Sequence, residues 1–118
     1  MINGVHALLY VKDAERVREF FRDVLGFSSV DAGHGWLIFA LPPAELGIHP
    51  TEDGGHQALY LLCDDVKAAV RELESKGVQI ARAIHEESWG LVTALALPGG
   101  GEIGLYQPKH PTALHLPR

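Results

Sequence analysis

Apolar and polar residues alternate in blocks along the first half of the chain, and the blocks predict one compact supersecondary unit. Residues 4–11 form a dense apolar run with β-branched and aromatic members, which is typical of a strand. Asp13 follows as a candidate N-cap, and an apolar stripe at helical spacing predicts a helix that ends at Gly26. Glycine and proline then separate three short strand candidates. These strands are expected at residues 27–32, 35–42 and 44–50, and the stripe consists of Val17, Phe20, Phe21, Val24 and Leu25.

The second half repeats this order of elements. A strand is expected at residues 55–63, Asp64 or Asp65 is a candidate cap, and Gly77 ends a second helix. Corresponding residues of the two halves lie roughly fifty positions apart in the chain, which indicates a duplicated unit. This separation increases toward the end of the second half, which predicts a longer loop near residues 85–90. The second helical stripe is Val66, Ala69, Val70 and Leu73, and the later strands are expected at residues 78–84, 89–98 and 101–108.

These patterns predict a single α+β domain made of two β-α-β-β-β modules. Repeat one covers about residues 1–52 and repeat two about residues 53–110. Each helix covers one face of a curved, mixed sheet, and the two modules together form a cup whose concave side suits a ligand. Strand alternation sends Leu46, Ile48, Ile103 and Leu105 to the core. The cup is then lined by His6, Tyr10, Glu45, His49, His56, Tyr60, Glu102 and Tyr106, with Gly47 and Gly104 leaving room for a ligand.

Composition narrows the function classes. The chain has 118 residues, 47% of them hydrophobic, and a formal net charge of -5, which suits one globular domain and not a nucleic-acid surface. Cys63 is the single cysteine, so no disulfide forms within the chain. The first residues lack the features of a secretory signal, and no apolar run approaches the roughly 20 residues of a membrane span. We therefore expect a cytoplasmic protein that contacts neither nucleic acid nor membrane.

The predicted cup contains side chains that can bind a divalent metal. His6 and His56 open the two repeats, and Glu45 and Glu102 begin the strands that close them. Imidazole and carboxylate groups converging from related strands are typical of such a site. A carboxylate that does not bind the metal can act as a general base if burial raises its pKa, so Glu45 and Glu102 are the catalytic candidates. A single histidine on a strand is more often an ordinary surface residue, which is the competing interpretation.

Three segments carry a family resemblance that spans essentially the whole chain: "VHALLYVKDAERVREFFRDVLGF", "GGHQALYLLCDDVKAAVRELESKGV" and "LPGGGEIGLYQP". In this order and spacing they resemble the vicinal oxygen chelate superfamily, which includes glyoxalase I, extradiol dioxygenases and bleomycin-resistance proteins. The resemblance implies metal ligands at His6 and His56. The family's closing-strand carboxylate falls on Gly104, whereas Glu102 lies two residues earlier, roughly 6.5–7 Å along the same face. His49 is the further nitrogen that can complete the metal shell.

The resemblance implies a protein that binds a small molecule, with two alternatives for its chemistry. In the first, a divalent cation of unassigned identity serves as Lewis acid in a lyase, isomerase or dioxygenase. In the second, a metal-free protein sequesters a flat or hydrophobic ligand, as bleomycin-resistance proteins do. A homodimer is expected in both cases, because an unpaired edge strand invites association and symmetric dimers are the commonest oligomers. The aromatic residues available for stacking are Tyr10, Trp36, Tyr60, Trp89 and Tyr106.

Overall fold

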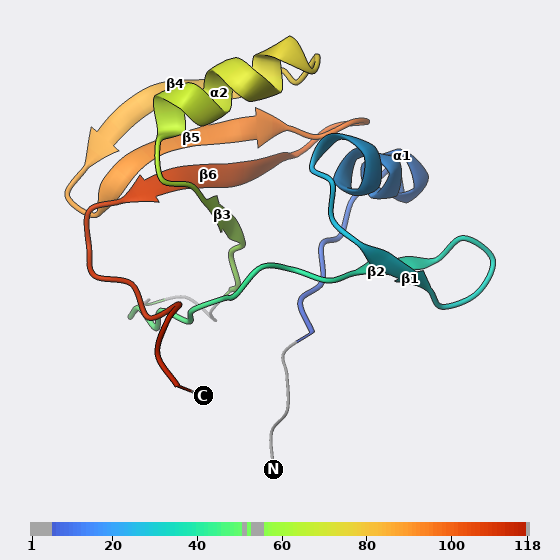
Figure 1. Ribbon diagram of the computed structural model, residues 1–118, viewed down its shortest axis with the longest axis horizontal. Coiled ribbons are helices and arrows are strands. Elements are labelled where there is room, and N and C mark those ends of the chain that lie inside the picture. Colours follow the sequence, from blue (N-terminus) through green and yellow to red (C-terminus); the bar gives the residue numbers. More distant parts are fainter. Residues whose placement is uncertain (1–5, 51, 53–55, 118) are drawn as a thin grey trace.

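A computed structural model describes residues 6–50, 52 and 56–117 and shows two helical regions around a mixed sheet (Figure 1). The predicted α+β class is confirmed. Helix α1 (Ala14–Glu19) runs directly into a π-helical segment, η1 (Phe20–Val24), and α2 spans Val66–Ser75. The strands are β1 (Ser29–Asp31), β2 (Leu37–Phe39), β3 (Tyr60–Leu62), β4 (Ile80–Glu87), β5 (Gly90–Ala96) and β6 (Glu102–Pro108).

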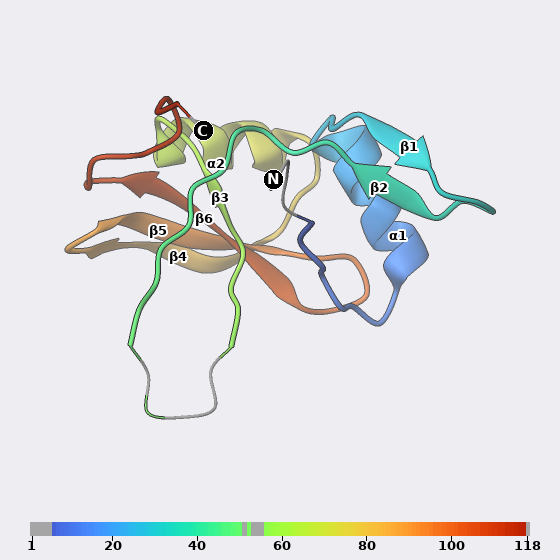
Figure 2. The ribbon, with the colours of Figure 1, turned by 90° about the horizontal axis from the view of Figure 1, so that it is seen from below.

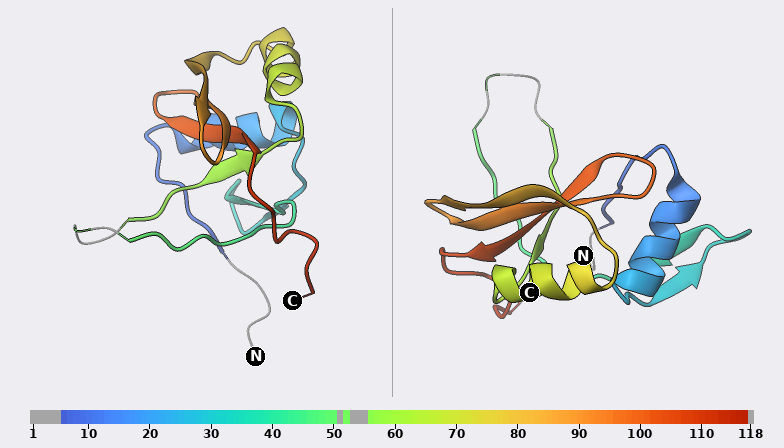
Figure 3. Two further views of the ribbon diagram at one scale, coloured as in Figure 1. Left: turned by 90° about the vertical axis from the view of Figure 1, so that its left-hand side faces the viewer. Right: turned by 90° about the horizontal axis from the view of Figure 1, so that it is seen from above.

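The second half of the chain builds a complete four-stranded sheet in the order β3-β6-β5-β4. Strands β3 and β6 are parallel, while β6, β5 and β4 are antiparallel to their neighbours, so the sheet is mixed as predicted. Helix α2 lies along one face of this sheet (Figures 1 and 3). Ile103 and Leu105 face the helix and are only 2% and 4% exposed, which confirms the alternation predicted for the last strand.

The helices begin and end where their local sequence predicts. The Asp13 carboxylate accepts the Arg16 N–H at 3.4 Å, and the Asp65 carboxylate accepts the Ala68 N–H at 3.1 Å. Each bond satisfies a donor that the first helical turn leaves without a partner. Gly26 and Gly77 follow the helices with φ of 75° and 86°, a left-handed conformation that strains residues with a Cβ. Both caps and both stops are therefore encoded locally.

One hydrophobic core joins the two halves of the chain. Val17, Phe20 and Phe21 of the first helical region are buried in the same cluster as Leu95 of β5 and Val66 of α2. Phe21 also contacts Phe27 and Phe39, with ring centroids 6.0 and 5.7 Å apart. The first helical region is thus buried in the same core as the sheet and helix of the second half.

The first half does not form the four-stranded sheet that was predicted for it. Among its described residues only β1 and β2 pair, and the candidate strands at the start of the chain and at 44–50 have no strand structure where they are described. Leu46 and Ile48, expected in the core, are 85% and 88% exposed, so that prediction is wrong for the single chain. The reason is that the apolar stripe of the first helix is already buried against the second half, which leaves these strands nothing to cover them. Residues 44–50 and 56–59 instead project together from the side of the sheet opposite α2 (Figures 2 and 3).

The longer loop expected near residues 85–90 is also absent. Strand β4 continues to Glu87 and β5 begins at Gly90, so Ser88 and Trp89 alone form the turn of a tight hairpin. The added residues lengthen both strands, to eight and seven residues against three each in β1 and β2. The hairpin places Trp89 beside the end of β6, where Lys109 N–H donates to the Trp89 carbonyl at 2.9 Å. Within the described residues, no helix has the length and apolar character of a membrane span.

Candidate ligand-binding face

The sheet has an open face, which we define as the β3-β6-β5-β4 side chains that point away from α2. The paired register places four of them in one row: Tyr60, Gly104, Ala94 and Arg82, one from each strand in order. Neighbouring strands lie about 4.8 Å apart, so this row extends about 14 Å across the sheet. Two of its members, Gly104 and Ala94, have little or no side chain, so the longer side chains at the two ends of the row, Tyr60 and Arg82, can extend over the centre of the face.

Three aromatic side chains meet at one end of the open face and form what we term the aromatic cluster: Tyr60, Trp89 and Tyr106. The ring centroids of Tyr60 and Trp89 are 6.1 Å apart, those of Tyr60 and Tyr106 are 5.6 Å apart, and those of Trp89 and Tyr106 are 4.9 Å apart. The rings are inclined to one another by 75°, 85° and 88°, so every pair is edge-to-face, a geometry that the ring quadrupoles favour. Tyr60 is 46% exposed and Trp89 is 37% exposed, which leaves ring surface accessible to a ligand.

Two glycines make this arrangement possible. A Cβ on Gly104 would lie 2.2 Å from Cδ1 of Tyr60, so the tyrosine ring rests directly on the glycine backbone. A Cβ on Gly90 would lie 2.8 Å from Cδ2 of Tyr106 and 2.7 Å from the Gln107 carbonyl oxygen. Glycine in a strand interior often marks such a close approach. Gly104, which occupies the position of the expected metal-binding carboxylate, therefore accommodates an aromatic ring.

The C-terminal segment contacts the aromatic cluster from the side. The Tyr106 hydroxyl lies 3.0 Å from Nε2 of His110, and Nδ1 of His110 lies 2.8 Å from the Pro111 carbonyl. A carbonyl only accepts, so in the neutral ring Nδ1 carries the proton and Nε2 accepts from the tyrosine. Three residues further on, the Ala113 N–H donates to Glu45 at 2.6 Å. Burial, the Glu45 carboxylate and the neighbouring Tyr60 together raise the pKa of Tyr106.

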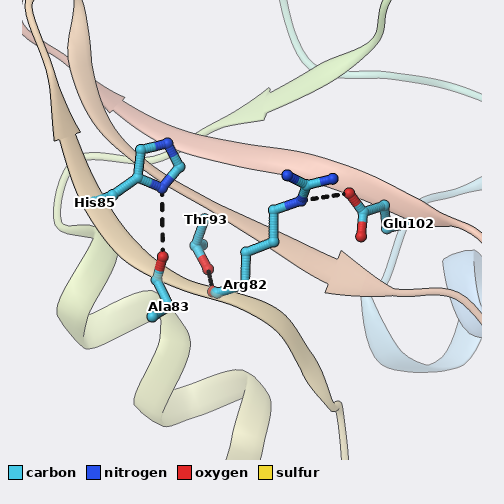
Figure 4. A network of polar contacts seen from close by, with 5 residues as sticks. All are labelled: Arg82, Ala83, His85, Thr93 and Glu102. Carbon is cyan, nitrogen blue, oxygen red and sulfur yellow. Dashed lines mark hydrogen bonds and ion pairs between the residues drawn. The ribbon is translucent and has the colours of Figure 1, made fainter.

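The other end of the open face carries an ion pair that crosses a strand. Nε of Arg82 on β4 donates to Glu102 on β6 at 2.6 Å, and the arginine side chain passes over β5 (Figure 4). Ala94 lies beneath this crossing and is 4% exposed. The buried Thr93 hydroxyl donates to the Arg82 carbonyl at 2.6 Å, where the β4–β5 register is irregular. His85 is 3.4 Å from the Ala83 carbonyl and 3.6 Å from the Glu87 carboxylate.

The predicted metal ligands are not assembled in the described part of the chain. His6, His49 and His56 are exposed, and the Glu102 carboxylate is paired with Arg82. Among residues 6–50, 52 and 56–117, no three histidine, cysteine or acidic side chains are grouped closely enough to hold a metal ion. The donor set of one chain therefore does not fit a metal centre, and the metal and general-base roles stay predictions.

The structure separates the predicted aromatic residues and adds partners that the sequence pattern had missed. Tyr10 is 87% exposed, and Trp36 lies against Arg18, whose guanidinium carbon is 4.5 Å from the indole centroid. Arg82 falls within the strand predicted at residues 78–84, and His110 lies beyond the last predicted strand. Strand parity could have placed Arg82 on the open face once its pairing with Ala94 was known, but nothing in the sequence links His110 to Tyr106.

The opposite side of the sheet holds a cavity of about 290 Å³ between η1 and α2. Its walls are mainly apolar, and its charged members, Glu72 and Lys76, pair with each other at 3.6 Å. A ligand site needs polar groups that converge on the bound molecule. The aromatic end of the open face fits that description better, because the polar groups of Tyr60 and Tyr106 lie there beside the C-terminal segment that carries His110 and contacts Glu45.

Comparisons with known proteins agree with this fold. The family model described as Glyoxalase/Bleomycin resistance protein/Dioxygenase superfamily matches residues 5–104. TnmS3, an antibiotic binding protein from Streptomyces sp. CB03234, is 29% identical with a TM-score of 0.65, over 92% of this chain and 98% of that one. A glyoxalase/bleomycin resistance protein from the same source is also 29% identical, with a TM-score of 0.56 over 82% and 93%. A lactoylglutathione lyase from Agrobacterium tumefaciens, 17% identical with a TM-score of 0.62 over 88% and 92%, shares the fold. No curated protein matches the chain.

Proposed function

Because the chain belongs to the glyoxalase/bleomycin resistance protein/dioxygenase superfamily, we propose that it binds a planar aromatic small molecule on its open face and releases it unchanged. The observation that carries this proposal is the aromatic cluster of Tyr60, Trp89 and Tyr106, seated on Gly104 and Gly90. Stacking on such rings binds flat molecules through dispersion and apolar burial, and it needs no metal. The 29% identity to an antibiotic binding protein supports a role in binding a small molecule.

Intrinsic fluorescence tests this proposal directly. The chain has two tryptophans, so a Trp36→Phe background leaves Trp89 as the single indole reporter within the aromatic cluster. We expect flat bicyclic probes such as naphthalene derivatives to quench Trp89 saturably, and their saturated decalin analogues to bind far more weakly. Tyr106→Leu should weaken the binding of the aromatic probes about two- to ten-fold, since one stacking contact is worth about 0.5–1.5 kcal/mol. If flat and saturated probes bind equally, or if neither binds, the proposal fails.

We also propose that the functional form is a homodimer. Support comes from the apolar side chains that one chain leaves uncovered, with Tyr10 87%, Leu46 85% and Ile48 88% exposed. A monomer rarely exposes so many large apolar groups on unpaired extended segments. Light scattering should give twice the 12.8 kDa mass of one chain. Leu46→Asp with Ile48→Asp should shift the mass toward that of the monomer, and a wild-type monomer at every concentration would exclude the dimer.

The metal-dependent alternative is tested in the same preparations. If a divalent cation binds, His6, His56 and Glu102 with His49 are the residues that would hold it, and the ion would act as a Lewis acid. Metal analysis of protein purified without a chelator or a metal-affinity tag is decisive. The present proposal expects no stoichiometric metal. A full equivalent in the wild type that is lost in both His6→Ala and His56→Ala would replace the binding role with an enzymatic one.

A further inference from the structure

We infer that the open face selects ligands that carry a positive charge next to their aromatic part, with Glu45 as the selecting carboxylate. The inference rests on the proposed function and names the chemical class of its ligand. It combines two separate features: the mutual orientation of the rings in the aromatic cluster, and the distribution of charge around them.

The ring orientation suits a cation. Tyr60, Trp89 and Tyr106 are nearly perpendicular to one another, so their π faces point in three different directions. A flat neutral molecule can stack on only one such face at a time. A compact ammonium group, in contrast, is attracted by any aromatic face within about 6 Å of its centroid. The partial exposure of Tyr60 and Trp89 leaves such faces accessible.

Glu45 is brought to this position by tertiary contacts. It lies between β2 and β3, and its carboxylate accepts the Ala113 N–H at 2.6 Å. The same C-terminal segment is joined to the cluster through the 3.0 Å contact between His110 and Tyr106. The carboxylate is close enough to Tyr106 to act on its hydroxyl electrostatically. A full negative charge therefore lies at the margin of the aromatic cluster.

The other charges near the cluster largely cancel. Arg82 is paired with Glu102, and Lys109 is paired with Glu86. Glu87 lies 3.6 Å from His85, which neutralises it only when that ring is protonated. Among the described residues, Glu45 takes part in no ion pair with Lys, Arg or His. The local field is therefore negative, as is the whole chain with its formal charge of -5, and both favour a cation over an anion.

Matched probes separate the effect of a ligand's charge on affinity from the effect of its shape. Benzyltrimethylammonium and neopentylbenzene have the same size and form but differ by one positive charge, and phenylacetate supplies the anion. Titration of Trp89 fluorescence in the Trp36→Phe background should show the cation binding about ten-fold more tightly than its neutral isostere, and the anion more weakly than either. Added salt should weaken the binding of the cation and leave the affinity for the neutral probe unchanged.

Glu45→Gln is the decisive variant, because the amide oxygen can still accept the Ala113 N–H while the charge is removed. We expect it to reduce the affinity for the cation about three- to ten-fold and to leave the neutral probe unaffected. Glu74→Gln makes the same charge change on exposed α2, behind the sheet, and should alter neither affinity. Equal binding of cation and neutral isostere, or equal losses for both in Glu45→Gln, would overturn the inference and leave the proposed function intact. Absence of binding by every aromatic probe would remove both.

Discussion

Because the Tyr60 ring lies directly against the backbone of Gly104, we expect Gly104→Ala to displace the ring and destabilise the protein. The new methyl carbon would lie 2.2 Å from Cδ1 and 2.5 Å from Cε1 of the Tyr60 ring. Ordinary carbon contacts are about 3.5–4.0 Å, so the ring must move away by more than about 1 Å. Doing so breaks two edge-to-face contacts, with Trp89 and Tyr106, each worth about 0.5–1.5 kcal/mol.

The expected cost is the difference between two terms. Losing both ring contacts removes about 1–3 kcal/mol, while alanine in place of a strand glycine returns about 0.5–1 kcal/mol of backbone entropy. The free energy of unfolding should therefore fall by about 1 kcal/mol, within limits of about 0 and 2.5 kcal/mol set by the two terms. Urea denaturation followed by circular dichroism measures this as a lower midpoint with an unchanged slope. The variant should also lose affinity for aromatic probes, because the displaced ring belongs to the ligand-binding face.

Two controls make this prediction refutable. Gly47→Ala changes the corresponding glycine of the first half, where the added Cβ lies 3.5 Å from the His49 ring in ordinary contact, so its stability should change by less than about 0.5 kcal/mol. In a Tyr60→Ala background, Gly104→Ala should no longer be destabilising, because nothing remains for the methyl group to displace. If Gly104→Ala is as stable as Gly47→Ala, or if its penalty persists without the Tyr60 ring, the proposed seat is wrong.

Three further predictions concern residues around the sheet. Thr93→Val removes the buried donor that bonds the Arg82 carbonyl at 2.6 Å and should cost about 1–3 kcal/mol by urea denaturation, whereas Thr93→Ser should retain most of that contribution. Glu102→Gln should cost no more than about 0.5 kcal/mol by the same assay, since the Arg82–Glu102 side chains are 65% and 38% exposed; a loss above 2 kcal/mol would contradict this. Burial and two adjacent aspartates raise the pKa of Cys63 from 9.0 to about 11, so iodoacetamide should react more slowly at pH 8 with the folded protein than in urea. The raised pKa stabilises the fold below pH 9, and this contribution should be lost as the pH rises toward 11; a folded-state reaction midpoint near 9 would refute it.

Much of the second half could be predicted from its own sequence because the decisive interactions are local. Asp65 caps α2 by accepting the N–H of Ala68, three residues further on, and Gly77 ends the helix through its own left-handed backbone conformation. Alternation along β6 follows from strand geometry alone, and it correctly placed Ile103 and Leu105 under α2 and Tyr106 on the other face. The family resemblance rests instead on three sequence segments in their order and spacing, and the family model over residues 5–104 confirms it.

The same local rules were insufficient for the first half and for the candidate site. Residues 44–50 have the alternation of a strand, yet a strand forms only when a partner strand and a covering helix are available. Helix α1 cannot cover them, because its apolar side is already buried in the core with the second half of the chain. The contacts of the open face join residues far apart in the chain: Glu45 meets Ala113, Arg82 reaches Glu102 across β5, and Tyr60 rests on Gly104. Local sequence determines helix ends and the two faces of a strand through short-range geometry. Only the tertiary structure decides which strands pair and in what register, and that pairing places an aromatic ring where a metal-binding carboxylate was expected.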